Sequence, residues 1–391
     1  MYGLTRAKTY RRGAEEMQRE RRENQERSCS SLRSLCASAS PKGISFGAPL
    51  RWILLLSALL SLTACTKAPL HHQESFVFGT RVEVLVAGLD EAKARPAAAA
   101  VLREFDRLHR IYHAWKPSEL SALNEAIAAG KTHDVTPEMA ALIADAQRIA
   151  LAGERLFDPG IGGLIKLWGF QSDEFKAALP DPAALASWRA ARPGIADVQF
   201  DGLRASSRNR AVALDLGGYL KGVALDRAAA ILREQGVSNA LINIGGNVMA
   251  LGTKNGERWR VGIQHPRQPG PLATVTLEDG EAIGTSGDYQ RYFELEDKRY
   301  CHLLDPRSAE PVTHTQSLTV LITPRPAAGT LSDAASKPLF IAGAEWPRLA
   351  RALAVDQVLR VDAEGHVQVS SALHRRLEYV GGQPKALEIL P

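Results

Sequence analysis

Four residues between positions 215 and 221 have the types and the spacing needed to meet a phosphate group. Asp215 is followed by the glycines Gly217 and Gly218, and then by Lys221 near the start of a helical pattern. Glycines let a backbone approach a ligand closely, and the free N–H groups of a helix start favour an anion, to which a lysine adds a positive charge. The segment therefore predicts an anion site where a strand ends and a helix begins. An ordinary strand-turn-helix corner is the alternative.

The apolar spacing along the chain predicts the elements that would position this segment. A helix is expected over 219–235, closed by Gly236, and further helices over 90–112, 137–152 and 181–191. Strands are expected over 77–86, 240–243, 259–263, 273–277, 292–295, 318–322 and 358–362. With no repeat at solenoid periods, the sequence predicts an α+β fold. This would be a single mixed α/β catalytic domain over 76–391, with a helical lobe within 120–200.

The charge of the chain argues against nucleic acid as a partner. The full chain has 391 residues and a formal charge of +5, but residues 1–51 carry 11 Lys/Arg and only 5 Asp/Glu. From residue 65 onward, 37 basic residues face 38 acidic ones. A near-neutral domain lacks the basic surface that nucleic-acid binding needs.

The N-terminal part reads as a leader followed by a lipid anchor. Arg51 precedes an uncharged run over 52–64, which is too short to span a bilayer but suits the core of a signal peptide. The run ends in Leu62, Thr63, Ala64 and Cys65, which resembles a bacterial lipobox. We expect cleavage before Cys65, a lipid on its thiol, and a tether over 65–75 that holds the domain at a membrane on the periplasmic side. The first 45 residues are long for such a leader, which favours a later start of translation. A core helix with an incidental cysteine is the alternative.

Several motif classes are absent. The chain has no G-x-x-x-x-G-K-[ST], and Gly284 to Asp288 lacks the spacing of a G-x-S-x-G nucleophile elbow. His109 and His113 are four residues apart, but no H-E-x-x-H glutamate accompanies them, so we expect a partly packed histidine pair instead of a metal site. What remains is a series of glycine-rich polar turns over 157–163, 243–247 and 285–291, followed by the segment 302–307. Each of these is a weak signal by itself.

In their order along the chain, these motifs resemble the flavin transferases known as ApbE, or FAD:protein FMN transferases. The resemblance covers essentially all of residues 76–391. It is carried by the segments 78–80, 118–124, 157–159, 168–170, 215–226, 243–247, 259–266, 285–287 and 302–307, and by Asp333. It implies that FAD is cleaved at its pyrophosphate and that FMN is joined through a phosphoester to a Thr or Ser of a partner protein. That acceptor would belong to a membrane redox complex.

The resemblance also implies roles for individual residues. Phe78 and Trp115 would lie against FAD, as suits aromatic rings. Asp215 and Lys221 would hold the flavin or the pyrophosphate, while His302 would be the general base for the acceptor hydroxyl. The same cleft would be lined by Leu156, Phe157, Asp158 and Leu304. The Gly218 carbonyl and Asp333 would bind Mg²⁺.

One residue departs from the pattern of this family. Members usually have a Thr four residues after the metal-binding Asp, whereas Asp333 is followed at that position by Lys337. Mg²⁺ requires oxygen ligands, and an ammonium group offers none. Lys337 would then take the place of the metal, or Ser336 would supply the missing oxygen while Lys337 turns to the phosphates. The sequence therefore predicts one of two alternative functions. The chain is either an active transferase or a flavin-binding accessory protein of a periplasmic redox system with weak or no metal-dependent transfer.

Overall fold

The computed structural model describes residues 69–172, 174 and 176–391. The leader, Cys65 and the first part of the expected tether lie outside these residues. The described residues belong to one compact unit, Lys67–Pro391. No helix among them is both long enough and apolar enough to cross a membrane.

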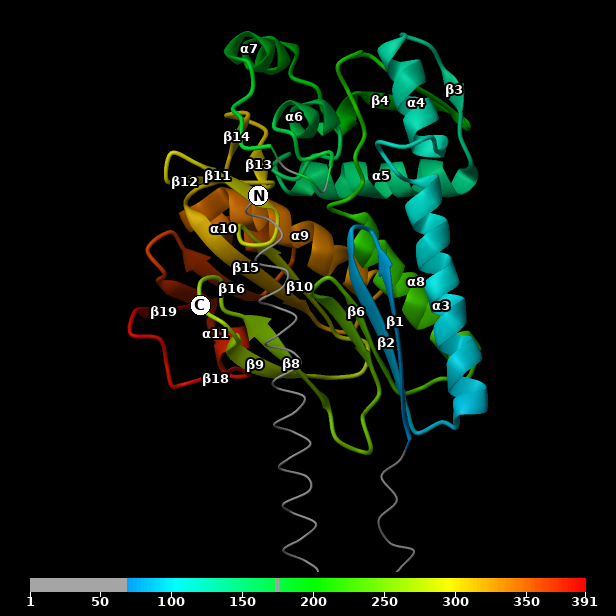
Figure 1. The fold of residues 1–391 in the computed structure, drawn as a ribbon, viewed down its shortest axis with the longest axis vertical. Coiled ribbons are helices and arrows are strands. Elements are labelled where there is room, and N and C mark those ends of the chain that lie inside the picture. Colours follow the sequence, from blue (N-terminus) through cyan, green and yellow to red (C-terminus); the bar gives the residue numbers. More distant parts are fainter. Residues whose placement is uncertain (1–68, 173, 175) are drawn as a thin grey trace, which may run out of the picture. The chain divides into compact units, whose positions relative to one another are not determined.

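A nine-stranded sheet forms the centre of this unit (Figure 1). Its strands, in spatial order, are β1 (Leu70–Val77), β2 (Thr80–Ala87), β6 (Ala240–Ile244), β7 (Asn247–Leu251), β10 (Ala282–Gly287), β15 (Thr315–Ile322), β16 (Gln357–Asp362), β17 (Val367–Ser370) and β19 (Leu387–Leu390). Neighbouring strands are antiparallel except β17 and β19. Alternate residues of β2, such as Val82 and Val84, are fully buried, which pins the register of the strand.

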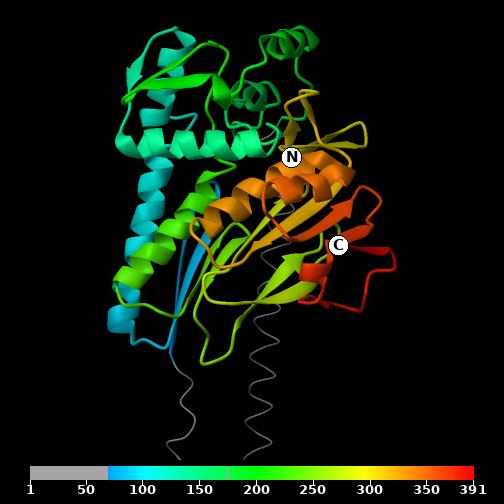
Figure 2. The ribbon, with the colours of Figure 1, turned by 180° about the vertical axis from the view of Figure 1, so that it is seen from behind.

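Helices cover one face of this sheet, as the view from behind shows (Figure 2). They are α3 (Glu91–Ile111), α8 (Leu220–Glu234), α9 (Ala328–Ala342) and α10 (Trp346–Ala352). Their buried side chains, such as Phe105, Leu225 and Leu339, form the main core with the inward residues of β2 and β6. The other face packs on a small sheet of β8 (Trp259–Gln264), β9 (Pro271–Leu277) and β18 (Glu378–Tyr379), and on α11 (Ser371–His374).

A separate lobe contains the other helices and a small sheet. Its elements are α4 (Glu119–Ala128), α5 (Pro137–Ala152), α6 (Gly162–Leu167), α7 (Pro182–Ala191), β3 (His133–Asp134), β4 (Val198–Asp201) and β5 (Arg204–Ser207). Two hairpins follow in the chain: β11 (Tyr292–Leu295) with β12 (Lys298–Cys301), and β13 (Leu304–Asp305) with β14 (Glu310–Pro311). The expected helical lobe is therefore present, with a three-stranded sheet in addition.

The four expected helices, α3, α5, α7 and α8, agree closely with the sequence prediction because their ends carry strong local signals, whereas α4, α6, α9 and α10 were not among the expected helices. Asp90 caps α3, Asp181 caps α7, and Thr136 caps α5 one residue before a proline. Gly236 follows α8 with a φ of +74°, the left-handed conformation that closes a helix. The expected strands from position 240 onward are also present, with bounds that differ by up to three residues.

Three local expectations were wrong. The strand expected over 77–86 is a hairpin, whose first strand β1 begins at Leu70 within the expected tether. Its alternate residues are exposed, so its polar composition hid it. Asp215 does not follow a strand. The segment before it forms one isolated β-bridge, between Ala213 and Ile161. In the expected turn over 285–291, the first three residues are instead the end of the central strand β10, and the turn begins at residue 288.

Two glycines bring α8 and α9 into close contact. A β-carbon on Gly222 would lie 2.5 Å from the carbonyl oxygen of Gly329, and one on Gly329 would lie 2.8 Å from that of Gly222. Side chains at these positions would push the helices apart. The crossing places Asp333 of α9 beside the first turn of α8, where its Oδ2 accepts a hydrogen bond from Gly222 N at 2.9 Å. The carboxylate thus caps the N-terminus of a neighbouring helix.

Candidate active site

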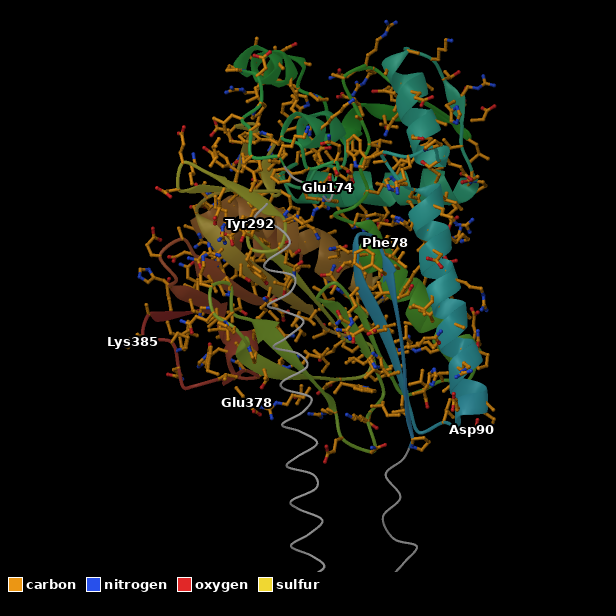
Figure 3. All side chains as sticks on the ribbon, in the orientation of Figure 1. Phe78, Asp90, Glu174, Tyr292, Glu378 and Lys385 are labelled. Atoms are coloured by element: carbon orange, nitrogen blue, oxygen red, sulfur yellow. The ribbon has the colours of Figure 1, made fainter. Side chains whose placement is uncertain are left out.

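A cleft of about 890 Å³ contains most of the residues singled out in the sequence. Its walls come from the β1–β2 turn, the end of α3, the segments 156–161 and 215–221, and α9. Figure 3 labels Phe78 and Glu174, two of the residues that line it. The predicted residues in its lining are Phe78, Trp115, Leu156, Phe157, Asp158, Asp215, Gly218, Lys221, His302, Leu304 and Lys337. Asp333 and Ser336 are fully buried behind this surface.

Phe78 is held at the cleft by an unusual backbone conformation. It forms the two-residue turn between β1 and β2 with Gly79, and both residues have positive φ, 57° and 68°. Such a turn matches the twist of a hairpin, but the left-handed region is strained for a phenylalanine. Its ring packs against Phe105, with 6.1 Å between centroids, and meets His109 edge-on at 5.7 Å. The strain at the site is therefore offset by packing that fixes the ring.

Trp115 is oriented by Asp215. The indole Nε1 donates to Asp215 Oδ2 at 3.1 Å, and Gly217 N donates to Oδ1 at 2.7 Å. Burial raises the pKa of Asp215, while both hydrogen bonds oppose this shift by favouring the carboxylate. Asn124 holds the segment in place, since its side chain exchanges hydrogen bonds with Leu214 N at 2.7 Å and Leu214 O at 2.9 Å. The hydrogen bonds of the Asn124 side chain thus hold the backbone where the sequence predicted the pairing of a strand.

Asp158 lines the cleft but has a structural role. Its Oδ1 accepts hydrogen bonds from Gly160 N at 2.8 Å and Ile195 N at 2.7 Å, and Oδ2 lies 3.4 Å from Arg155 Nε. Burial raises the pKa of this carboxyl, and the two backbone donors oppose the shift. The carboxylate of Asp158 therefore ties the loop around residue 160 to the segment around Ile195. Its apolar neighbours Leu156 and Phe157 also line the cleft and are the residues of this loop that we expect to contact a ligand.

His302 presents an unprotonated ring nitrogen. Its Nδ1 lies 3.1 Å from the carbonyl oxygen of Arg291, and because a carbonyl only accepts, Nδ1 carries the proton. The lone pair of the neutral ring is then on Nε2. The pKa of His302 is lowered to about 3, mainly by burial and to a smaller extent by the positive charges of Arg291 and Lys221. The ring is consequently a neutral acceptor at physiological pH.

Three cationic residues surround this part of the cleft: Lys221, Arg291 and Lys337. The charges of all three act on His302, and Lys221 also acts on Lys337. Arg291 donates from Nη2 to the carbonyl oxygen of Phe170 at 2.9 Å. Arg291 was not among the predicted site residues, although its position at the end of the polar segment 285–291 was a usable signal. Such a group of charges suits a ligand with several phosphate oxygens.

The sequence from residue 78 to residue 359 matches the model of the ApbE family. This chain belongs to the ApbE family. A protein of Rhodobacter capsulatus named FAD:protein FMN transferase is 40% identical over 340 residues, which cover 86% of this chain and 64% of that protein. This chain thus spans less than two thirds of the length of that relative. A protein of the same name from Klebsiella pneumoniae is 33% identical over 256 residues, covering 63% of this chain and 72% of the relative.

Solved structures of ApbE proteins share the fold. The crystal structure of the ApbE protein from Thermotoga maritima has a TM-score of 0.72 and 29% identity, and the match covers 79% of this chain and 99% of that one. This ApbE chain therefore has the expected α+β fold of the family.

Asp333 and Ser336, which were expected to bind Mg²⁺, make close contacts with other protein groups in this ApbE chain. Asp333 Oδ1 accepts a hydrogen bond from Asn247 Nδ2 at 2.9 Å and is paired with the Lys337 ammonium. Asp333 Oδ2 accepts a hydrogen bond from Gly222 N. Ser336 Oγ is 2.7 Å from both Ser286 Oγ and the Asp333 carbonyl oxygen. Octahedral coordination requires several free oxygens around one point. The Asp333 carboxylate and the Ser336 hydroxyl are already engaged by protein groups.

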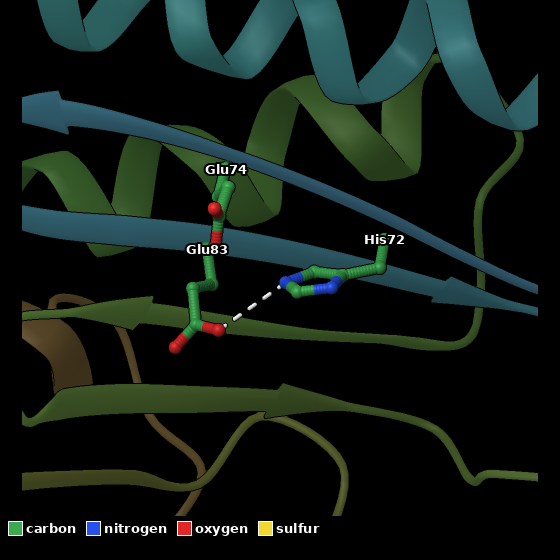
Figure 4. A group of neighbouring side chains, drawn as sticks. All are labelled: His72, Glu74 and Glu83. Atoms are coloured by element: carbon green, nitrogen blue, oxygen red, sulfur yellow. Dashed lines mark hydrogen bonds and ion pairs between the residues drawn. The ribbon is translucent and has the colours of Figure 1, made fainter. Parts of the chain in front are cut away.

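A second group of possible ligands lies on the β1–β2 hairpin. His72, Glu74 and Glu83 come close together there, with His72 Nε2 at 3.2 Å from Glu83 Oε1 (Figure 4). Arg81 donates to Glu74 at 2.9 Å and to Glu83 at 2.6 Å, and Asn243 donates to Glu83 at 3.0 Å. Arg81 thus pairs with both carboxylates, and these contacts orient them. The group is therefore an ion-pair network of the sheet surface. The histidine pair His109 and His113 is partly buried beside the cleft, with 5.1 Å between ring centroids.

Proposed function

We propose that this chain is an FAD:protein FMN transferase that joins FMN to a Thr or Ser hydroxyl of an acceptor protein. One observation carries the proposal: the neutral His302, with its lone pair on Nε2, lies in the same cleft as Lys221, Arg291 and Lys337 and as the Trp115–Asp215 pair. This arrangement combines a general base, charges for a pyrophosphate and an oriented aromatic ring. The names of the ApbE relatives support the same reaction.

The chain's own groups account for each part of this reaction. His302 Nε2 takes the proton from the acceptor hydroxyl, whose oxygen attacks the phosphorus of the FMN half. The phosphorus–oxygen bond of the anhydride breaks, and AMP leaves with the electron pair. Lys221 and Arg291 balance the negative charge that builds up on the phosphate oxygens. Phe78 and Trp115 hold the flavin beside them, and Leu304 closes an apolar wall.

The second candidate function is a flavin-binding accessory protein of a periplasmic redox system. The pairing of Lys337 with Asp333 favours it, because this pair stands where metal-dependent transfer would require an ion. Both candidates bind FAD, and only the first releases AMP and modifies an acceptor.

The test is incubation of the purified chain with FAD and a subunit of a membrane redox complex that carries FMN on threonine. We expect the acceptor to gain the mass of FMN less one water, and AMP to appear in equal amount. An acceptor whose target threonine is replaced by alanine serves as the control. FAD binding without any change in acceptor mass would support the accessory role instead.

Trp115 is expected to contribute to FAD affinity through its ring and through its bond to Asp215. Trp115→Ala should weaken FAD binding by about 1 kcal/mol from lost aromatic contact, and further because Asp215 loses a hydrogen-bond donor. Trp115→Phe keeps a ring and should lose less. Flavin fluorescence titration measures both variants. Equal affinity in wild type and Trp115→Ala would contradict the placement of the flavin against this ring.

We also propose that the domain is a lipoprotein held at a membrane on the periplasmic side through Cys65. The support is the uncharged run over 52–64 that ends in a lipobox-like sequence. Cys65→Ser is expected to block lipidation and to release the domain from the membrane fraction or leave the leader uncleaved. Cell fractionation and the mass of the processed protein measure this. A membrane fraction and a mass that both stay unchanged would contradict the anchor.

A further inference from the structure

We propose that the Lys337 ammonium takes the place of a divalent cation in this chain, so that FAD is held, and its FMN transferred, without a metal ion. The inference rests on the proposed function for its transfer step. The part of the inference that concerns FAD binding does not depend on the transfer reaction and is measured by itself.

The position of the ammonium is the first observation. Lys337 extends along the start of α8, since a β-carbon on Gly218 would lie 3.4 Å from Lys337 Cε. Its Nζ donates to the Asp333 carbonyl oxygen at 2.7 Å and also to Asp333 Oδ1. The side chain is only 12% exposed, and it lines the cleft. The cation therefore lies between the two residues, Gly218 and Asp333, that were expected to share a metal.

The second observation is the direction of Ser336. The sequence left open whether this residue replaces the missing oxygen ligand, with Lys337 turned away. Ser336 is fully buried, and its hydroxyl bonds to Ser286 of β10 and to its own helix. It thus joins α9 to the sheet and does not face the cleft. The geometry favours the arrangement in which Lys337 stands in for the metal.

The charges show how a monocation can suffice. An ammonium has three N–H groups, and two of those of Lys337 are used by Asp333, which leaves one for a phosphate oxygen. Asp333 also neutralises part of the charge of Lys337. The remaining positive charge comes from Lys221 and Arg291 in the same cleft. Three fixed cations distributed around the pyrophosphate can thus replace one dication.

FAD affinity with and without metal tests this inference on the full chain. Wild type should bind FAD equally well, within about twofold, in EDTA and in Mg²⁺. Lys337→Met should bind at least about tenfold more weakly in both, because a charged hydrogen bond is lost. Lys337→Thr should be weak in EDTA and recover in Mg²⁺, since it restores an oxygen beside Asp333. Lys254→Met removes an exposed lysine of the β7–β8 connection and should match wild type.

The wild-type measurement decides the matter even if a variant fails to fold. A loss of FAD affinity of tenfold or more in EDTA would overturn the inference, as would a folded Lys337→Met that binds like wild type. Transfer to the acceptor only in the presence of Mg²⁺ would overturn it and leave the proposed function intact. Metal-independent, Lys337-dependent binding without transfer would support the binding step and reject the proposed function. Absence of FAD binding under all conditions would overturn both.

Discussion

Replacing His302 with asparagine is expected to slow FMN transfer by about 10² to 10⁴-fold, the usual contribution of a general base. The asparagine amide can still donate to the Arg291 carbonyl oxygen, which His302 Nδ1 contacts at 3.1 Å, so the loop should keep its structure. FAD affinity should change little because the flavin contacts come from other residues. The rate of mass gain by the acceptor and the fluorescence of bound FAD separate the two effects.

The pH dependence of wild type provides an independent check on the same residue. The pKa of His302 is lowered to about 3, so the ring loses its function as a base only when the pH falls through that value. The transfer rate should therefore show no step with an apparent pKa near 6.5 between pH 5 and pH 8. His366→Asn, at an exposed turn beside Asp362, is the matched control and should transfer at the wild-type rate. A His302→Asn protein with full transfer activity would rule out the base.

Removing the Asp333 carboxylate is expected to destabilise the fold by about 3–5 kcal/mol, as for other broken buried ion pairs. Asp333 is fully buried and joins α9 to Gly222 N of α8 and to the Asn247 amide of β7, and it also pairs with Lys337 one turn further along α9. Asp333→Ala leaves an ammonium and two N–H donors without their acceptor. Urea unfolding followed by circular dichroism measures the loss.

Two comparisons assign the loss to the buried pair. Asp134→Ala removes a carboxylate that is 83% exposed and 3.5 Å from Arg204, and should cost less than about 1 kcal/mol. Adding Lys337→Met to Asp333→Ala should recover part of the stability, because the unpaired buried cation is then gone as well. A cost below about 1 kcal/mol for Asp333→Ala would mean that the contacts of this carboxylate do not hold the helices together.

Four helices, α3, α5, α7 and α8, could be predicted because their signals are local, whereas the core helix α9 and the central strands β7 and β10 were not predicted. Capping residues such as Asp90 and Thr136 lie beside the helices they begin, and apolar spacing records which face of an element is buried. The cleft residues were also accessible from the sequence, since they belong to short motifs that occur in a characteristic order. Eleven of the thirteen residues named for the cleft and the metal line one cavity.

The sequence by itself determined the fold class, the family resemblance and the membership of the site. The tertiary structure decided how the site residues are used. Contacts between residues that are separated in the sequence set these roles: the Asn124 side chain holds Leu214, the backbone carbonyl of Arg291 positions His302, and the Ser286 hydroxyl turns Ser336 away from the cleft. The direction of Lys337 likewise depends on the α8–α9 crossing that two glycines permit. No local pattern records such contacts, because their geometry exists only after the helices have packed.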